Sequence, residues 1–157
     1  MKTKIAVFFV VAGLLGFSQS CTKNDVRKPV PGRIRIGLVL DKGGKDDKSF
    51  NAAAFKGAAE AVKDLGVELK TIESPDDNAY EPAIRQLSER GYNLVIVVGF
   101  SQADPLRKIA PLFPKTHYGI IDADLDIPNV ASLIFSEHEG SFLVGYIAGL
   151  KSKTKTV

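Results

Sequence analysis

The chain has very few of the residues that form disulfides and metal sites, with one cysteine and two histidines among 157 residues. A single cysteine has no partner for an intramolecular disulfide. His117 and His138 fall on different expected elements, and neither has a second metal ligand at helical spacing. We therefore expect no metal site, and we interpret both histidines as surface or structural residues.

The chain also lacks a large excess of charge of one sign. Its formal charge is +3, to which the first twenty residues contribute Lys2 and Lys4 but no acid, and the remainder holds 19 basic and 18 acidic residues. A nucleic-acid-binding domain needs a basic face, so this balance argues against a nucleic-acid partner. Hydrophobic residues make up 45% and charged residues 25% of the chain, which is ordinary for one globular domain of this length.

The longest apolar run lies at the N-terminus, behind a short basic start. Residues 5–17 would span roughly 20 Å as a helix, which is short of the ~30 Å hydrocarbon core of a membrane. We therefore interpret residues 1–20 as an export signal peptide and not as a membrane helix.

The single cysteine, Cys21, follows this segment directly and is preceded by the small Ser20. The arrangement resembles the cleavage site of bacterial lipoproteins, in which the cysteine takes a lipid such as palmitate and becomes the mature N-terminus. The alternative is a free cysteine behind an ordinary signal peptide. We expect a lipoprotein anchored at the cell membrane and facing the periplasm or the exterior, with residues 21–32 as a charged, proline-containing tether.

Beyond the tether, strand-like apolar runs alternate with helical patterns. Asn78 with Glu81, and Ser136 with Glu139, have the spacing of capping boxes. The alternation requires right-handed crossovers between parallel strands, so it predicts an α/β fold with a doubly wound parallel sheet. Strands are predicted at 33–40, 67–72, 94–98, 118–121 and 130–135, and helices at 50–65, 78–90, 105–112 and 142–150.

The helix predicted at 50–65 begins with an aromatic residue and is followed by a glycine. Gly66 is expected to end it as a left-handed cap. Its expected core-facing side comprises Phe50, Ala53, Ala54, Gly57, Ala58, Ala61, Val62 and Leu65.

Three predicted strands are followed directly by residues suited to bind a ligand: Asp41, the Gly99-Phe100-Ser101 turn, and Asp122. In doubly wound sheets ligands bind outside the carboxyl ends of the strands, so we expect these segments to converge at one edge of the sheet. The loop after the first strand, VLDKGGKDDKSFN, also joins the strand-end carboxylate of Asp41 to Phe50 and Asn51.

These turns do not carry the common nucleotide-binding or hydrolytic signatures. Lys45 is preceded by two adjacent glycines and followed by Asp46, whereas a P-loop has four residues between its glycines and Ser or Thr after its lysine. A dinucleotide fingerprint is absent, and Asp46 with Asp47 resembles a phospho-receiver pocket only loosely. Ser101 follows Gly-Phe instead of lying in a Gly-x-Ser-x-Gly elbow, and its spacing to Asp104 is that of a helix N-cap.

Two chemistries remain, acid–base catalysis by Asp41 and Asp122 as in glycosidases, or binding of a small molecule. Strand-end carboxylates in this architecture more often accept hydrogen bonds from ligands, and leaving such groups unpaired costs roughly 1–3 kcal/mol each. An aromatic face can stack on a planar base, for a gain on the order of 1–3 kcal/mol. Asp41 with Phe50 therefore predicts a ligand with a flat ring and hydroxyl groups. The alternative for Phe50 is a core residue of its helix.

Several longer segments match a known family. The stretches IGLVLDKGGKDDKSFNAAAFKGAAEA, VVGF, YGIID and FSEHEGSFLVGYIAG, with the lipoprotein-like start, resemble the basic membrane protein family of bacterial substrate-binding lipoproteins. The resemblance covers residues 34–150. It implies a type I periplasmic-binding fold of two lobes and a non-enzymatic role, binding purine nucleosides for the permease of an ABC importer without a cofactor.

Carried over to this chain, the resemblance implies roles for individual residues. Phe50 would stack on the base, Asp41 would bind the base edge, and Asp122 would hold the ribose hydroxyls. Asn51 and the Gly99-Phe100-Ser101 turn would line the same cleft.

Members of this family continue into a second lobe. We therefore expect residues 33–135 to form the N-terminal ligand-binding lobe, and residues 136–157 to form a crossover helix and the start of a second lobe that is largely absent. Two other functions stay open. One is an exported sensory protein that passes its signal to a partner other than a permease, and the other is an exported enzyme that acts on nucleosides or sugars through Asp41 and Asp122.

Overall fold

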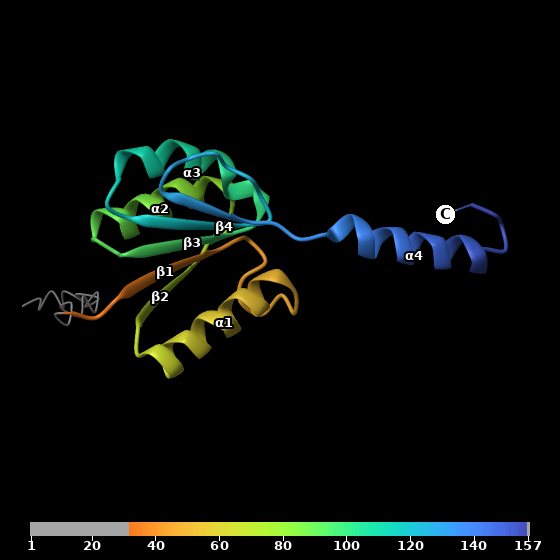
Figure 1. Ribbon diagram of the computed structural model, residues 1–157, viewed down its shortest axis with the longest axis horizontal. Coiled ribbons are helices and arrows are strands. Elements are labelled where there is room, and N and C mark those ends of the chain that lie inside the picture. The colour runs from red at the N-terminus through yellow and green to blue at the C-terminus, as the bar shows by residue number, and fades with distance from the viewer. Residues whose placement is uncertain (1–31, 157) are drawn as a thin grey trace, which may run out of the picture.

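A five-stranded parallel sheet organises the protein, with the strand order β2-β1-β3-β4-β5 (Figure 1). The structure is a computed structural model that describes residues 32–156. Because β2 and β3 lie on opposite sides of β1, the chain winds both ways from the first strand, and the predicted doubly wound α/β fold is confirmed. The strands are β1 (Arg35–Leu40), β2 (Glu68–Glu73), β3 (Leu94–Val98), β4 (His117–Ile121) and β5 (Val130–Leu133).

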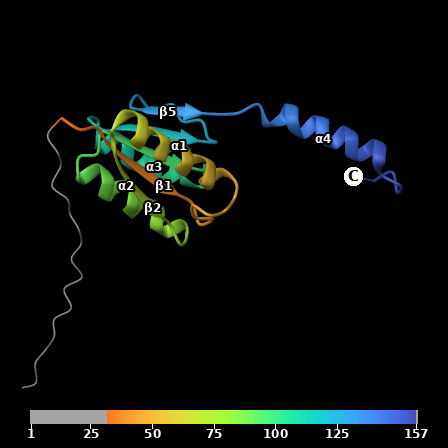
Figure 2. The same cartoon turned by 90° about the horizontal axis from the view of Figure 1, so that it is seen from below.

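Helices cover both faces of the sheet. Helix α1 lies against one face, and α2 and α3 lie against the other (Figures 1 and 2). Short 3₁₀ turns precede or follow the helices on the second face. The bounds are α1 (Phe50–Leu65), η1 (Asp77–Ala79), α2 (Tyr80–Glu89), η2 (Phe100–Gln102), α3 (Ala103–Ile109), η3 (Ala110–Leu112) and α4 (Glu137–Lys151).

Successive residues of the strands enter two separate cores, because side chains alternate between the faces of a sheet. Val39 belongs to the larger core under α2 and α3, whereas its neighbours Leu38 and Leu40 belong to the smaller core under α1. The larger core also contains Ile84, Leu87, Val95, Val97, Leu106, Ile109, Tyr118 and Ile120. The fully apolar β3 contributes to both cores, as expected for a central parallel strand.

The core-facing side of α1 differs from the predicted one. The helix packs on the sheet through Ala54, Phe55 and Ala58, whereas Val62 and Leu65 are 38% and 75% exposed. The residue that begins this stripe, Asn51, is polar, and the many alanines spread apolar character around the helix. A count of hydrophobic residues therefore placed Ala54 and Ala58 correctly on the core-facing side but missed Asn51 and Phe55.

The predicted helix ends are partly correct. Gly66 ends α1 in the left-handed conformation, and its N–H donates to the Val62 carbonyl. The capping boxes are wrong: Asp76, not Asn78, supplies the side-chain cap before α2, through the η1 turn. The side chain of Ser136 makes no capping bond, and its backbone carbonyl accepts from the Glu139 N–H instead.

Helix α4 extends away from the sheet (Figures 1 and 2). None of its residues is buried. Its large apolar side chains are 58 to 71% exposed, and they include Phe142, Leu143, Tyr146, Ile147 and Leu150. Among the described helices, none is both long and apolar enough to cross a membrane. The expected signal peptide and Cys21 lie outside the described residues, and the expected domain bounds stay a prediction.

Candidate functional site

The carboxyl ends of β1, β3 and β4 bring the three predicted segments together. The Gly99 N–H, after β3, donates to the Ile121 carbonyl at 3.0 Å, directly before Asp122. A Cβ placed on Gly99 would lie 3.4 Å from Oδ2 of Asp41. Gly99 also has a φ of +98°, which a glycine adopts at little cost. The expected convergence of these segments at one sheet edge is therefore present.

The carboxylate of Asp41 is fixed through one of its oxygens. Oδ1 accepts from the Gly43 N–H at 2.8 Å and from the side-chain amide of Asn51. Oδ2 lies on the side of Gly99 and has no hydrogen-bond donor among residues 32–156. This arrangement orients one oxygen toward the strand-end turn while the protein's own donors occupy the other.

Asn51 plays a different part from the one expected. Its side chain is 1% exposed, so it does not line the surface of a cleft. It accepts from the Asp41 N–H at 3.2 Å and donates back to the Asp41 carboxylate. Asn51 therefore orients the Asp41 carboxylate from the buried side of the loop.

Phe50, the first residue of α1, lies at the surface of the same region. It is 45% exposed and belongs to neither buried core cluster. Its ring meets that of Phe135 edge to face, with the centroids 6.4 Å apart and an interplanar angle of 75°. Sequence reasoning placed Phe135 at the end of a strand and did not connect it with the site. Phe100, in η2, is 72% exposed.

Asp122 follows β4 in the left-handed region, with a φ of +69°. Its N–H donates to the Leu133 carbonyl at 2.8 Å, which continues the pairing of β4 with β5. Hydrogen bonding to Asp122, together with its negative charge, raises the pKa of Glu137 at the start of α4. Sequence reasoning missed Glu137, which lies fifteen positions further along the chain.

The turn after β3 is built differently from the N-cap that was predicted. Ser101 lies inside η2, and α3 starts without any side-chain cap. The adjacent Gln102 is fully buried, and its Nε2 donates to the carbonyls of Val39 at 3.1 Å and Val98 at 2.8 Å. Gln102 thus joins the ends of β1 and β3 beneath the site. The sequence signal that could have identified Gln102 is a polar residue in the fourth position after an apolar strand.

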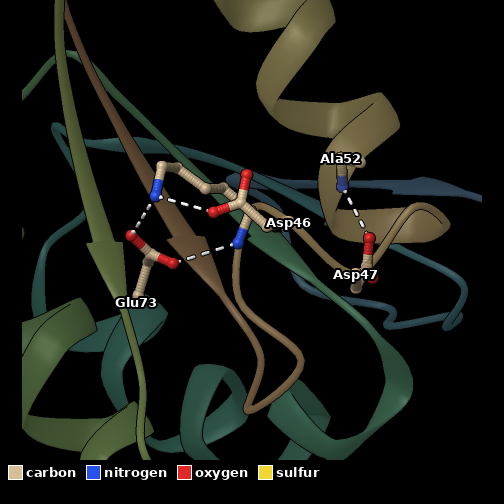
Figure 3. Close-up of polar contacts among 5 residues, drawn as sticks. Asp46, Asp47, Ala52 and Glu73 are labelled. Carbon is tan, nitrogen blue, oxygen red and sulfur yellow. Dashed lines mark hydrogen bonds and ion pairs between the residues drawn. The ribbon is translucent and has the colours of Figure 1, made fainter.

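The loop between Asp41 and Phe50 is held at its far end by Asp47. Its Oδ1 accepts from the Ala52 N–H (Figure 3) and from the Ser49 N–H, and its Oδ2 accepts from the Asn51 N–H. These backbone donors, that of Ser49 foremost, lower the pKa of the Asp47 carboxyl. Asp47 is therefore the residue whose side chain caps the start of α1.

Within the described part of the chain, no group of three or more His, Cys, Asp or Glu side chains is arranged to hold a metal ion. The site offers carboxylates, exposed aromatic rings and a close glycine turn. Such a surface can accept hydrogen bonds and stack on a ring.

The chain is similar to several known proteins. It is 32% identical over 142 residues to an uncharacterized lipoprotein of Pyrococcus abyssi, which covers 88% of this chain and 34% of the relative. It is 34% identical over 140 residues to basic membrane protein A1 of Borrelia garinii, which covers 86% of this chain and 40% of the relative. A solved structure of an ABC transporter system solute-binding protein from Aeropyrum pernix is 38% identical, with a TM-score of 0.69, over 74% of this chain and 32% of that chain.

The chain thus spans about a third to two fifths of the length of these relatives. The family model described as "ABC transporter substrate-binding protein PnrA-like" matches residues 34–157. This match includes every described residue of the sheet edge that carries Asp41, Gly99 and Asp122, and it confirms the resemblance inferred from the sequence. The chain belongs to the PnrA-like family of ABC transporter substrate-binding proteins.

Proposed function

We propose that the protein is the solute-binding lipoprotein of an ABC importer, and that its ligand is a purine nucleoside bound at the carboxyl edge of the sheet. The family description supports the transporter role, and the names of the relatives, lipoprotein and basic membrane protein, support an exported, membrane-anchored protein. In this proposal residues 33–135 form one wall of the ligand cleft, and a second lobe supplies the other.

The observation that most supports the proposal is that only one oxygen of the Asp41 carboxylate is used by the protein's own donors among the described residues. Gly43 and Asn51 use Oδ1, so Oδ2 keeps its capacity to accept a hydrogen bond from a ligand. A carboxylate that is already oriented loses little freedom when it binds, and this favours recognition of an N–H group on a base edge. Phe50 adds an exposed ring on the neighbouring helix end for stacking.

The sugar end of the ligand would meet acidic groups. Asp122 and Glu137 lie close enough for Asp122 to raise the pKa of Glu137. Two carboxylates side by side suit a ribose, whose neighbouring hydroxyls can donate one hydrogen bond to each and separate the like charges. The Gly99 turn, without a Cβ, lets a ligand approach the backbone between Asp41 and Asp122.

The anchor in this proposal is Cys21. Lipid on this residue would hold the domain near a permease, with residues 22–32 as the spacer. Metabolic labelling with a fatty-acid analogue tests it: wild-type protein should take the label and Cys21→Ser should not. A labelled Cys21→Ser protein in the membrane fraction would contradict the anchor.

Calorimetric titration of the protein with inosine, guanosine, adenosine and ribose tests the ligand. Asp41→Asn is the informative variant because its single side-chain oxygen cannot serve both the internal donors and the ligand. We expect nucleosides to bind more tightly than ribose, and Asp41→Asn to weaken nucleoside binding by about tenfold or more.

Asp104→Asn is the matched control, because Asp104 is exposed and pairs only with Arg107 among the described residues. Unchanged nucleoside affinity in Asp41→Asn would remove Asp41 from the site. Conversion of the nucleoside into free base and sugar during the titration would instead support the enzymatic alternative.

A further inference from the structure

Glu73, which was not among the predicted site residues, contacts the loop between Asp41 and Phe50 from the strand beside β1. Glu73 is the last residue of β2, which pairs with β1 in register up to Leu40 and Glu73 themselves. Its Oε2 accepts from the backbone N–H of Lys45 at 3.0 Å, in the middle of the loop from Asp41 to Phe50 (Figure 3). Its Oε1 lies 3.5 Å from Nζ of the same lysine.

The loop is shaped for this contact. A Cβ placed on Gly44 would lie 2.8 Å from Oε2 of Glu73, closer than a Cβ can approach without displacement, and Gly44 has a φ of +65°. The positive φ favours glycine, and a Cβ here would also displace the Glu73 carboxylate from its present position. The Gly44 N–H donates to the Asp41 carbonyl at 3.0 Å, so the turn that brings Lys45 to Glu73 starts at the site residue itself.

The backbone bond, more than the ion pair, is the contact that fixes the loop. The side chains of Lys45 and Glu73 are 42% and 47% exposed, and ion pairs at that exposure stabilise proteins little. Lys45 Nζ is also shared with Asp46 at 3.1 Å. A backbone N–H, by contrast, is fixed in the chain, and a carboxylate acceptor makes its hydrogen bond stronger than a neutral one.

The loop also has backbone hydrogen bonds of its own: the Gly44 N–H donates to the Asp41 carbonyl at 3.0 Å, and the Asp47 N–H donates to the Gly44 carbonyl at 3.4 Å. Asp41 binds Gly43, and Asp47 binds the first turn of α1. Asp77, which lies outside the β1–α1 unit, is 3.5 Å from Nζ of Lys42 in the loop, but these side chains are 63% and 64% exposed. Among the described residues, Glu73 is therefore the one from another strand whose side chain binds the backbone of the loop centre.

We propose that Glu73 is a positioning residue for ligand binding: through the Lys45 N–H it holds the loop so that Asp41 and Phe50 face the same ligand. This inference rests on the proposed nucleoside site. Glu73 itself does not touch the ligand. It acts by reducing the conformational freedom that the loop would lose when the ligand binds.

Four variants separate this role from a general effect on stability. Glu73→Ala removes the acceptor, whereas Glu73→Gln keeps an oxygen for the Lys45 N–H. Lys45→Ala removes the ion pair and keeps the backbone N–H. Asp77→Ala removes the exposed contact to Lys42 and serves as the matched control.

The first measurement is amide hydrogen exchange of Lys45 in the protein without ligand. We expect exchange about tenfold faster in Glu73→Ala, because the amide loses a charge-assisted hydrogen bond. Glu73→Gln keeps a neutral acceptor, so its exchange rate should lie between those of wild type and Glu73→Ala. Lys45→Ala and Asp77→Ala should stay within about twofold of wild type, because ion pairs at this exposure contribute little. Unchanged exchange in Glu73→Ala would overturn the proposal.

The second measurement is calorimetric titration of the same variants with inosine. Glu73→Ala should bind about tenfold more weakly, by the same hydrogen-bond estimate, and Glu73→Gln should restore part of the affinity. Wild-type binding that is retained in Glu73→Ala would also overturn the proposal. If wild type binds no nucleoside, the proposed function fails, and hydrogen exchange alone then decides whether Glu73 holds the loop.

Discussion

Asp41 and Asn51 form a reciprocal pair: the Asp41 N–H donates to Oδ1 of Asn51 at 3.2 Å, and Nδ2 of Asn51 donates to the Asp41 carboxylate. The pair joins the first residue after β1 to the second residue of α1, so the nine-residue loop between them closes on itself. Because Asn51 is buried, the direction of the Asp41 carboxylate depends on the docking of α1.

Asn51→Ala should destabilise the protein by about 1–3 kcal/mol, because it leaves the Asp41 N–H and one carboxylate oxygen without their buried partner. Asn51→Asp should destabilise it at neutral pH as well, since two carboxylates would then face each other. Urea unfolding measures both changes. Asn78→Ala, at an exposed position in η1, is the control. An Asn51→Ala protein as stable as wild type would show that the pair is not structurally important.

Asp47 predicts a pH dependence of stability. Backbone N–H groups lower the pKa of its carboxyl in the folded state, below the ordinary value of about 3.9. Its stabilising contribution should therefore be complete above about pH 4, and it should disappear as the pH falls through the lowered pKa of the folded state. Asp47→Asn should be less stable than wild type at neutral pH, and the difference should shrink below about pH 4.

Urea unfolding at a series of pH values checks this, with Asp104→Asn as the control. Asp104 also lies in the first turn of a helix, but its carboxylate meets Arg107 and caps no backbone N–H among the described residues. A constant difference between Asp47→Asn and wild type from neutral to acidic pH would contradict the assignment of Asp47 as the cap.

The sheet could be predicted because parallel central strands are marked by apolar residues on both faces. The run at Leu94–Val98 was located to the residue, since five consecutive aliphatic residues, four of them β-branched, favour a short strand buried on both faces. The convergence of Asp41, Gly99 and Asp122 followed from topology alone, because the carboxyl ends of neighbouring parallel strands share one edge.

Contacts between side chains and distant backbone could not be predicted in the same way. The Lys45 N–H donates to Glu73 and the Gln102 side chain donates to the Val39 carbonyl, and neither bond leaves a periodic pattern in the sequence. The core-facing side of α1 was predicted only in part, for a related reason. Asn51 is polar, and its burial is made possible by two hydrogen bonds to Asp41. A hydrophobicity pattern does not predict burial of that kind.

Helix α4 should exchange its amide hydrogens faster than α2 in the monomeric protein. A single helix of this length is marginally stable in water, and its three glycines each weaken it by about 1 kcal/mol relative to alanine. None of its side chains is buried, whereas Tyr80, Ile84 and Leu87 anchor α2 in the core. Hydrogen exchange read by mass spectrometry, with the oligomeric state measured at the same concentration, checks this.

A paired substitution sharpens the test of α4. Ile147→Asp should change the unfolding free energy by no more than about 0.5 kcal/mol, as expected of an exposed position, whereas Ile84→Asp should unfold the domain. A monomer in which α4 is as protected as α2, or in which Ile147→Asp is strongly destabilising, would show that the helix packs on the domain.

Phe50 should contribute to nucleoside affinity and little to the fold. Its ring is 45% exposed and touches Phe135 only edge to face, so one face can accept a purine base. Phe50→Ala should weaken inosine binding by roughly 1–3 kcal/mol, the scale of stacking on a base, and leave ribose binding nearly unchanged.

Phe50→Leu keeps apolar bulk without the flat ring, so it should recover stability more fully than affinity. Calorimetry with both ligands, and urea unfolding of each variant, measure the two effects separately. Phe142→Ala on α4 is the matched control, since that ring is 71% exposed and lies outside the site. If ribose and inosine lose affinity equally in Phe50→Ala, the ring supports the structure of the loop and does not stack on the base.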